Sequence, residues 1–96
     1  VHAVMKLEAI NSALYTKLTI GNLILTYKNN TETRTMIGRS IGFFVYENWP
    51  QIKPLLQDIQ YICSKLNVNM VLPERKKLKI LTLLFGWQKA LDIIKK

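Results

Sequence analysis

The chain has 96 residues, 49% of them hydrophobic, which is enough apolar material for the core of one domain. Fourteen lysines and arginines against six acids give a net charge of +8 at pH 7, so we expect an anionic partner: nucleic acid, an anionic membrane or an acidic protein segment. One cysteine and one histidine exclude a disulfide framework and a zinc site, and no apolar run approaches the ~18–20 residues of a transmembrane helix.

The first predicted element is a helix over residues 3–27. Weak helix formers at residues 19–21 predict a kink, after which residues 22–27 resume as helix in preference to a short strand. The apolar residues recur at spacings of three and four and form one stripe: Val4, Leu7, Ile10, Leu14 and Leu18.

A polar connection follows over residues 28–41. Its first residues, 28–31, have the composition of a turn. We expect one or two helical turns between Thr31 and Gly38, and no long helix here.

An aromatic cluster, residues 42–46, leads into the next helix. Asn48 is the expected N-cap, with Pro50 in the first turn and Gln51 completing a capping box. Pro54 should delay the regular helix by about one turn. The apolar stripe of this helix ends near Leu66–Asn67 and comprises Ile52, Leu55, Leu56, Ile59, Ile62, Cys63 and Leu66.

The last predicted helix runs from Pro73 to Ile94. Apolar side chains cover most of its circumference, so we expect neighbours on several sides. Gly86 in its interior predicts either close packing of another element against the backbone or a kink. We expect two apolar helices to enclose the Gly86 backbone.

The densest basic run of the chain lies at the start of this helix. Cations there oppose the helix dipole at a cost of roughly a few tenths of a kcal/mol, which favours a use for the charge over a merely solvated face. Solubility alone is the alternative. The candidate basic patch for partner binding comprises Lys28, Arg34, Arg39, Arg75, Lys76, Lys77 and Lys79.

Trp87 and Leu83 are candidates for a shallow apolar pocket that binds a partner, because tryptophan often carries binding energy. Burial in the core is the alternative interpretation for Trp87, as for Trp49. Catalytic chemistry is not expected, since His2 is the only imidazole and the acids are scattered. We therefore expect no enzyme, no catalytic residue, no cofactor and no metal site.

These elements together predict an all-α fold. We expect a compact bundle of about four to six helices, with at most a short β-hairpin, in a single domain over residues 1–96. Because the chain starts at Val1 rather than at Met, we expect it to be a fragment of a longer protein.

Two segments resemble the C-terminal nucleocapsid-binding domain of rhabdovirus phosphoproteins, the lyssavirus type in particular. That family has a Gly-apolar-Phe-apolar-Tyr run before a helix of the form aromatic-x-Gln-Leu-Lys-x-x-Leu-x-Asp-Ile, and residues 42–46 and 49–59 are similar to it. The family's last helix carries an apolar-apolar-Gly-Trp step, here residues 84–87. The similarity covers roughly half of the chain. It departs from the family at the lysine-rich segment, where only Lys28 is kept, and at Thr82, where the family has Arg.

The resemblance implies that the chain is the C-terminal fragment of a longer protein, a viral polymerase cofactor. This non-enzymatic domain would tether the polymerase to nucleoprotein-coated RNA in the host cytoplasm and in the virion. The basic patch would hold an acidic loop of the nucleoprotein, and the pocket at Trp87 would contact other proteins. The rest of the chain would bind the polymerase complex, and no membrane partner is implied. A small nucleic-acid-binding domain is the alternative, and an accessory domain that only oligomerises is a third.

Overall fold

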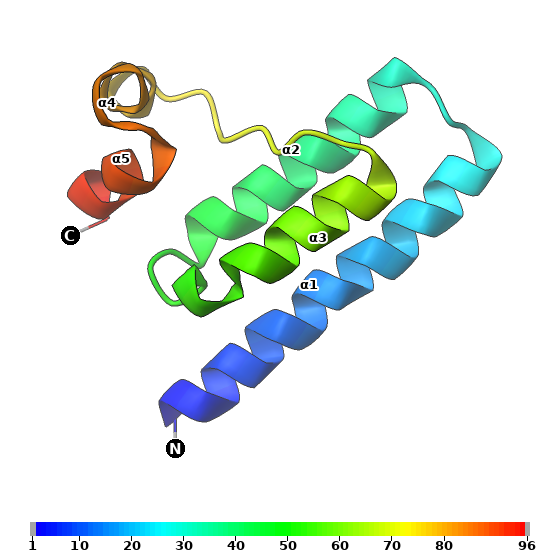
Figure 1. The fold of residues 1–96 in the computed structure, drawn as a ribbon, viewed down its shortest axis with the longest axis horizontal. Helices are drawn as coiled ribbons and strands as arrows, with labels where there is room; N and C mark the ends of the chain where they lie inside the picture. The colour runs from blue at the N-terminus through cyan, green and yellow to red at the C-terminus, as the bar shows by residue number, and fades with distance from the viewer. Residues whose placement is uncertain (1, 96) are drawn as a thin grey trace.

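Five α-helices and one 3₁₀ turn make up the computed structural model, which describes residues 2–95 and the side chains of residues 7–95. The model is 79% helical, and its described residues form no strand, so the all-α prediction is confirmed and the optional hairpin is not found. The elements in chain order are α1 (His2–Tyr27), α2 (Thr31–Glu47), η1 (Lys53–Leu55), α3 (Leu56–Leu66), α4 (Lys76–Phe85) and α5 (Trp87–Ile94) (Figure 1).

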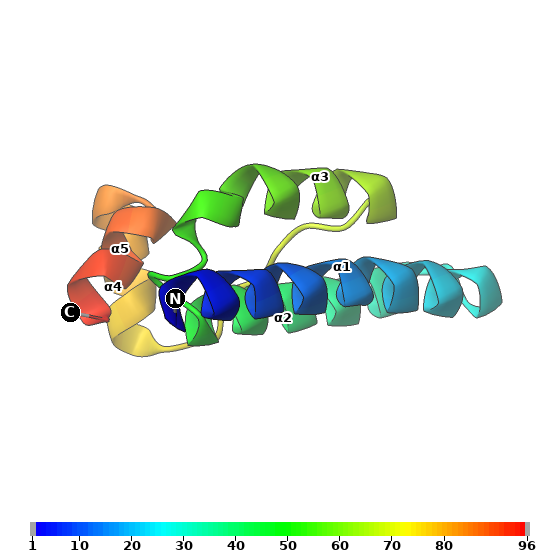
Figure 2. The same ribbon diagram turned by 90° about the horizontal axis from the view of Figure 1, so that it is seen from below.

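The first three helices form two layers. Helices α1 and α2 lie antiparallel and side by side, and α3 packs over one face of that pair (Figure 2). No other helix of the described chain covers the opposite face (Figure 2). Helices α4 and α5 pack on each other at the end of the molecule away from the α1–α2 turn (Figure 1). The domain is correspondingly flat, with principal extents of 40 × 36 × 17 Å.

The predicted apolar stripes supply the core. In α1, Ile10 and Leu14 are buried and Leu7 and Leu18 are half-buried, while the side chain of Val4 lies outside the described residues. The stripe predicted for α3 is buried at Ile52, Ile59, Ile62 and Leu66. Its end is also confirmed, because Asn67 takes up the left-handed conformation of a helix C-cap at φ 54°.

The kink predicted near residues 19–21 is wrong, because α1 is one helix of 26 residues. Gly21 is buried against α3: a Cβ on it would lie 2.9 Å from Cδ1 of Leu66. The packing of α3 on α1 outweighs the weak helix propensity of these residues.

The helix start predicted at Asn48 is also wrong. Helix α2 runs without interruption from Thr31 to Glu47, through the region expected to be mostly non-helical, and Asn48 is its C-cap. The N-cap is Asn30, whose Oδ1 accepts a hydrogen bond from the backbone N–H of Thr33 at 2.8 Å. Regular helix resumes only at Leu56, after the 3₁₀ turn that contains Pro54, so the predicted delay is confirmed.

Two glycines in α2 explain how the chain crosses this helix. The irregular segment 68–75 runs over the face that carries Gly38 and Gly42, and the N–H of Val71 donates to the carbonyl of Gly38 at 3.0 Å. A Cβ on Gly38 would lie 2.0 Å from the carbonyl oxygen of Asn69. The two glycines therefore let segment 68–75 approach the helix backbone directly.

The last predicted helix is two helices. Gly86 takes φ 86° and ψ 161° and separates α4 from α5. It is exposed, and nothing lies within 4 Å of the position its Cβ would take, so the expectation that two helices enclose it is wrong. The helix is interrupted at residue 86 because Gly86 has a backbone conformation that almost only glycine adopts. Helix α4 begins at Lys76, three residues after the predicted start at Pro73.

A candidate partner-binding surface on α4

Helix α4 begins with a cluster of exposed cations. Arg75 is its N-cap residue, Lys76 and Lys77 lie in the first turn and Lys79 follows. No acidic residue lies in that turn, and none of the four makes an ion pair with a described side chain. The free N–H groups and the dipole of the helix start add to the positive potential.

Arg75 is fixed by an aromatic ring of α2. Its guanidinium carbon lies 5.6 Å from the centre of the Tyr46 ring, and Nζ of Lys95 lies 4.5 Å from the same ring. These cation–π contacts hold the start of α4 and the end of α5 against the C-terminal part of α2. The basic cluster is thus attached to the core and does not sit on a free tail.

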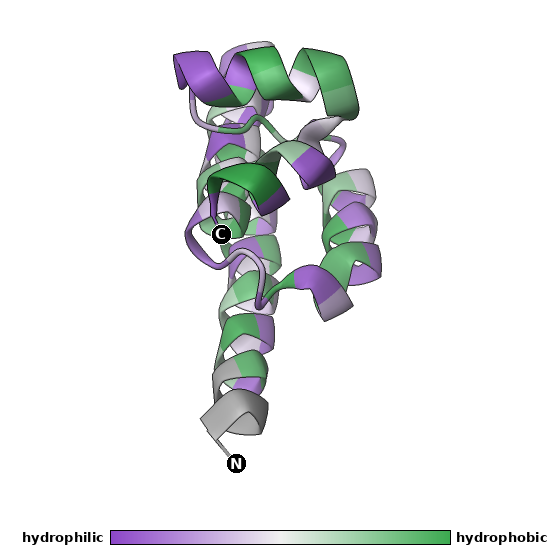
Figure 3. Cartoon of the chain, turned by 90° about the vertical axis from the view of Figure 1, so that its left-hand side faces the viewer, coloured by the Kyte–Doolittle hydropathy of each residue, from purple (hydrophilic) through white to green (hydrophobic). Residues whose placement is uncertain are grey.

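The outward face of α4 is apolar beyond the lysines. Ile80, Leu83 and Leu84 share this face, as their spacing of three and four requires, and are 51%, 82% and 67% exposed. Figure 3 shows α4 changing from hydrophilic at its start to hydrophobic along the rest of its length. The prediction that neighbours cover this helix on several sides is wrong, because only Leu78 of α4 is buried.

A shallow hollow of about 580 Å³ lies beside this face. Its walls include Leu72, Pro73, Leu78, Lys79, Leu83 and Trp87. The structure thus places the predicted pair Leu83 and Trp87 in one hollow, with a lysine of the basic cluster in its wall.

Trp87 is held in place by Trp49. The rings meet edge to face, with their centres 5.5 Å apart and their planes at 63°. Trp49 is buried at 2% exposure, and its indole N–H donates to Oδ1 of Asp92 at 2.9 Å. Nζ of Lys53 lies 2.7 Å from the same oxygen. Trp49 is therefore a core residue, whereas Trp87 is half-buried between the core and the hollow.

These two contacts also stabilise the ionised form of Asp92. The hydrogen bond from Lys53, followed by that from Trp49, holds the pKa of the Asp92 carboxyl below its usual range. The carboxylate thus links α5, which carries Trp87, to the turn that contains Trp49 and Lys53.

The seven predicted cations do not form one patch. Arg75, Lys76, Lys77 and Lys79 lie together, but Lys28 and Arg34 lie at the α1–α2 turn, at the other end of the molecule (Figure 1). Arg34 donates to the side chain of Asn29 there. The separation follows from α2 being a continuous helix of 17 residues, which spans ~25 Å at 1.5 Å per residue.

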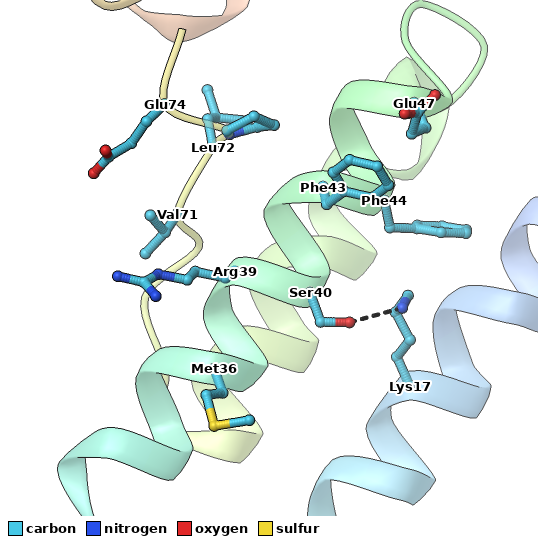
Figure 4. Close-up of a pocket in the computed structure, with 11 residues that line it drawn as sticks. Lys17, Met36, Arg39, Ser40, Phe43, Phe44, Glu47, Val71, Leu72 and Glu74 are labelled. Atoms are coloured by element: carbon cyan, nitrogen blue, oxygen red, sulfur yellow. Dashed lines mark hydrogen bonds between the residues drawn. The ribbon is translucent and has the colours of Figure 1, made fainter.

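Arg39 lies between the two groups of cations. It projects from the middle of α2 toward segment 71–74 (Figure 4). It belongs to neither the α4 cluster nor the pair at the α1–α2 turn.

Sequence reasoning missed the outward face formed by Ile80 and Leu84. The apolar circumference of α4 was the signal, but it was interpreted as a sign of burial.

Among the described residues, no three His, Cys, Asp or Glu side chains gather as a metal site, and no helix is both long and apolar enough to cross a bilayer. Comparisons of the chain with models of protein families, with curated proteins and with solved structures find no match.

Proposed function

We propose that this domain is a non-enzymatic binding module of a viral phosphoprotein, which attaches the polymerase complex to nucleoprotein-coated RNA. One observation carries the proposal: four exposed cations without ion-pair partners, Arg75 to Lys77 and Lys79, adjoin the apolar hollow of Leu83 and Trp87. The resemblance of residues 42–46, 49–59 and 84–87 to rhabdovirus phosphoproteins supports the choice of partner.

The two parts of this surface have different tasks in binding. The exposed cations raise the rate of encounter with an acidic segment of the nucleoprotein, because charge acts at a distance. The apolar hollow sets the lifetime of the complex, because differences in affinity lie mostly in dissociation. Lys28 and Arg34 are too far from α4 to contact the same short segment, so we narrow the proposed contact to α4.

The test is a charge reversal on α4. The triple variant K76E/K77E/K79E leaves the contact between Arg75 and Tyr46 in place. It should keep its circular dichroism spectrum and lose co-sedimentation with nucleoprotein–RNA rings. The matched control is K28E/R34E, which reverses two exposed or half-exposed cations at the other end of the molecule and should still co-sediment. Unchanged binding by the triple variant would defeat the proposal.

A second assay separates this proposal from nucleic-acid binding. Protein-free RNA should give no electrophoretic shift below tens of micromolar protein. A shift at lower concentration that weakens steeply with salt would instead indicate a nucleic-acid-binding domain, because phosphate contacts release counterions.

A further inference from the structure

A second surface lies on the opposite side of the α1–α2 layer from α3. Two adjoining hollows, of about 740 and 350 Å³, share Lys17, Met36 and Ser40 in their walls. Together they form one groove that follows α2 between α1 and segment 71–74. We call it the α1–α2 groove; Figure 4 shows the larger hollow.

The groove is lined by large apolar side chains that the described chain covers only in part. Ile20 and Ile24 of α1 are 50% and 42% exposed, and Met36 and Phe43 of α2 are 62% and 52% exposed. Met36, Ser40 and Phe43 follow one another at helical spacing along α2. An apolar stripe of this kind on a helix normally packs against another element.

The length of the groove fits one helix. Along α2 it extends from Thr33 to Glu47, a rise of about 14 residue steps or ~21 Å at 1.5 Å per residue. A partner helix of about four turns would fill it and would form a four-helix arrangement with α1, α2 and α3.

A cation at the middle of the groove indicates the chemistry of the occupant. Nζ of Lys17 donates to Oγ of Ser40 at 2.9 Å and lies 5.3 Å from the centre of the Phe44 ring (Figure 4). Lys17 is only half-exposed, and no carboxylate of the described side chains pairs with it. An apolar surface that covered the groove would bury the Lys17 charge without a partner, which costs free energy. A carboxylate on the covering surface would form an ion pair with Lys17 and offset that cost.

A second copy of this chain suits the groove poorly. A twofold axis through the middle of the groove would bring Lys17 and Arg39 close to their own copies, because an isologous contact uses the same patch twice. Each copy also carries a net charge of +8, which opposes the association.

We propose that the α1–α2 groove binds an acidic amphipathic helix of a partner protein. Its apolar face would lie on Met36 and Phe43, and a carboxylate near its centre would pair with Lys17. Glu47 and Glu74 line one end of the groove, so the positive N-terminal end of the partner helix is favoured there. The groove adjoins the α4 hollow, because segment 71–74 lines both. Lys17, Met36 and Phe43 line the groove alone, so variants of these residues test this proposal independently of the function proposed above.

The test uses helical peptides of about four turns, stapled so that they are helical before binding. Each peptide carries leucines at spacings of three and four, which form one apolar face. Several peptides are made, and they differ in which residue near the centre of the peptide is the glutamate. A matched set carries glutamine there. Titration into ¹⁵N-labelled protein should shift the amide signals of Ile20, Ile24, Met36 and Phe43 and leave those of α4 unchanged.

Two variants of the chain make the result specific. M36S/F43S removes exposed apolar side chains from the groove and should lower the affinity for the glutamate peptide at least about tenfold. K17M keeps the apolar stem but removes the charge, so it should abolish the preference for glutamate over glutamine. The control L83S/L84S alters α4 and should bind both peptides like the parent chain.

Several results would overturn the proposal. One is the absence of groove shifts with every peptide at concentrations up to about 1 mM, where even a weak site of about −4 kcal/mol is half filled. Others are equal binding of the glutamate and glutamine peptides, or shifts confined to α4. Sedimentation equilibrium that shows a dimer dissolved by M36S/F43S would identify a second copy as the occupant and would also refute it.

Discussion

Gly42 lies directly beneath the backbone of Val71. A Cβ on Gly42 would sit 1.9 Å from the carbonyl oxygen of Val71 and 2.4 Å from its carbonyl carbon. These are backbone atoms of a segment that is also hydrogen-bonded to α2 through Gly38, so they cannot move away as the end of a flexible side chain would. The position of segment 68–75, and with it the start of α4, therefore depends on the absence of a side chain at residue 42.

Replacing Gly42 with Ala should destabilise the domain. Better helix propensity would contribute about 1 kcal/mol in favour of Ala, but the clash forces segment 68–75 off the helix and should cost about 3 kcal/mol or more. We expect a net loss of about 2 kcal/mol or more in the free energy of unfolding, measured by urea denaturation followed by circular dichroism.

Gly21→Ala is the matched control. It is also a buried helical glycine, but its Cβ would meet the end of the flexible Leu66 side chain at 2.9 Å. The side chain can turn aside, so the variant should lie within about 1 kcal/mol of the parent. Equal stability of the two variants would show that segment 68–75 does not depend on close approach to α2.

Gly86→Ala tests the break between α4 and α5. There is open space for the methyl group, so any loss comes from the backbone, which must keep φ 86° and ψ 161°. That region costs an L-residue about 1–3 kcal/mol. We expect a lower urea midpoint. We also expect a red shift of tryptophan emission, because Trp87 loses its ring contact with Trp49 and becomes more exposed to water.

A D-alanine at residue 86, introduced by chemical synthesis, is the matched control. It adds the same methyl group but favours positive φ, so it should keep the stability of the parent chain. If D-Ala and L-Ala were equally harmful, the positive φ at residue 86 would not be the cause.

The sequence predicts the helices that depend on local signals. The stripe from Ile52 to Leu66 is found across η1 and α3, and the delay at Pro54 is the 3₁₀ turn η1 itself, because periodicity and proline act within a few residues. Helix α2 was mostly missed because Gly38 and Gly42 count against a helix until their contacts with Asn69 and Val71 are known.

The candidate site was predicted only in part, for a related reason. Leu83 near the end of α4 and Trp87 at the start of α5 are only four residues apart, so they line the same hollow although the helix breaks between them. The prediction that Lys28 and Arg75 belong to one basic patch is wrong, because α2 separates the two ends of the molecule and its length could not be known from the sequence. Nor can composition distinguish an apolar face that the chain itself covers from one that stays exposed, as at Leu84.

The exposed apolar residues of α4 should be dispensable for folding. Leu83 and Leu84 are 82% and 67% exposed, so L83S/L84S should change the free energy of unfolding by no more than about 1 kcal/mol. Leu78, 2% exposed on the same helix, is the matched control, and its replacement by Ala should cost about 2–5 kcal/mol. Urea denaturation measures both. Severe destabilisation by L83S/L84S would mean that the outward face is part of the core.

Stability should fall in acid through Asp92. Its pKa is lowered in the folded state, chiefly by Lys53 and then by Trp49, so its contribution is present above the unfolded pKa of about 3.9 and is lost as pH falls through the folded value. D92N keeps an oxygen that can accept from the Trp49 indole but carries no charge. The urea midpoint should therefore depend less on pH in D92N than in the parent below about pH 5. Identical acid profiles would show that the Asp92 contacts do not link protonation to folding.

In alkali, the sensitive contact is that between Tyr15 of α1 and Asp58 of α3. The Tyr15 hydroxyl donates to Oδ1 of Asp58 at 2.5 Å, and this bond, with burial and the carboxylate charge, raises the pKa of Tyr15. A raised folded pKa means that the contribution is complete below the ordinary value of about 10 and is lost as pH rises through the folded value. In an ultraviolet titration, the ionisation that Tyr15→Phe removes should lie above the ordinary value of about 10, and D58N should bring it back toward that value. If D58N left the titration unchanged, the bond between α1 and α3 would not persist in solution.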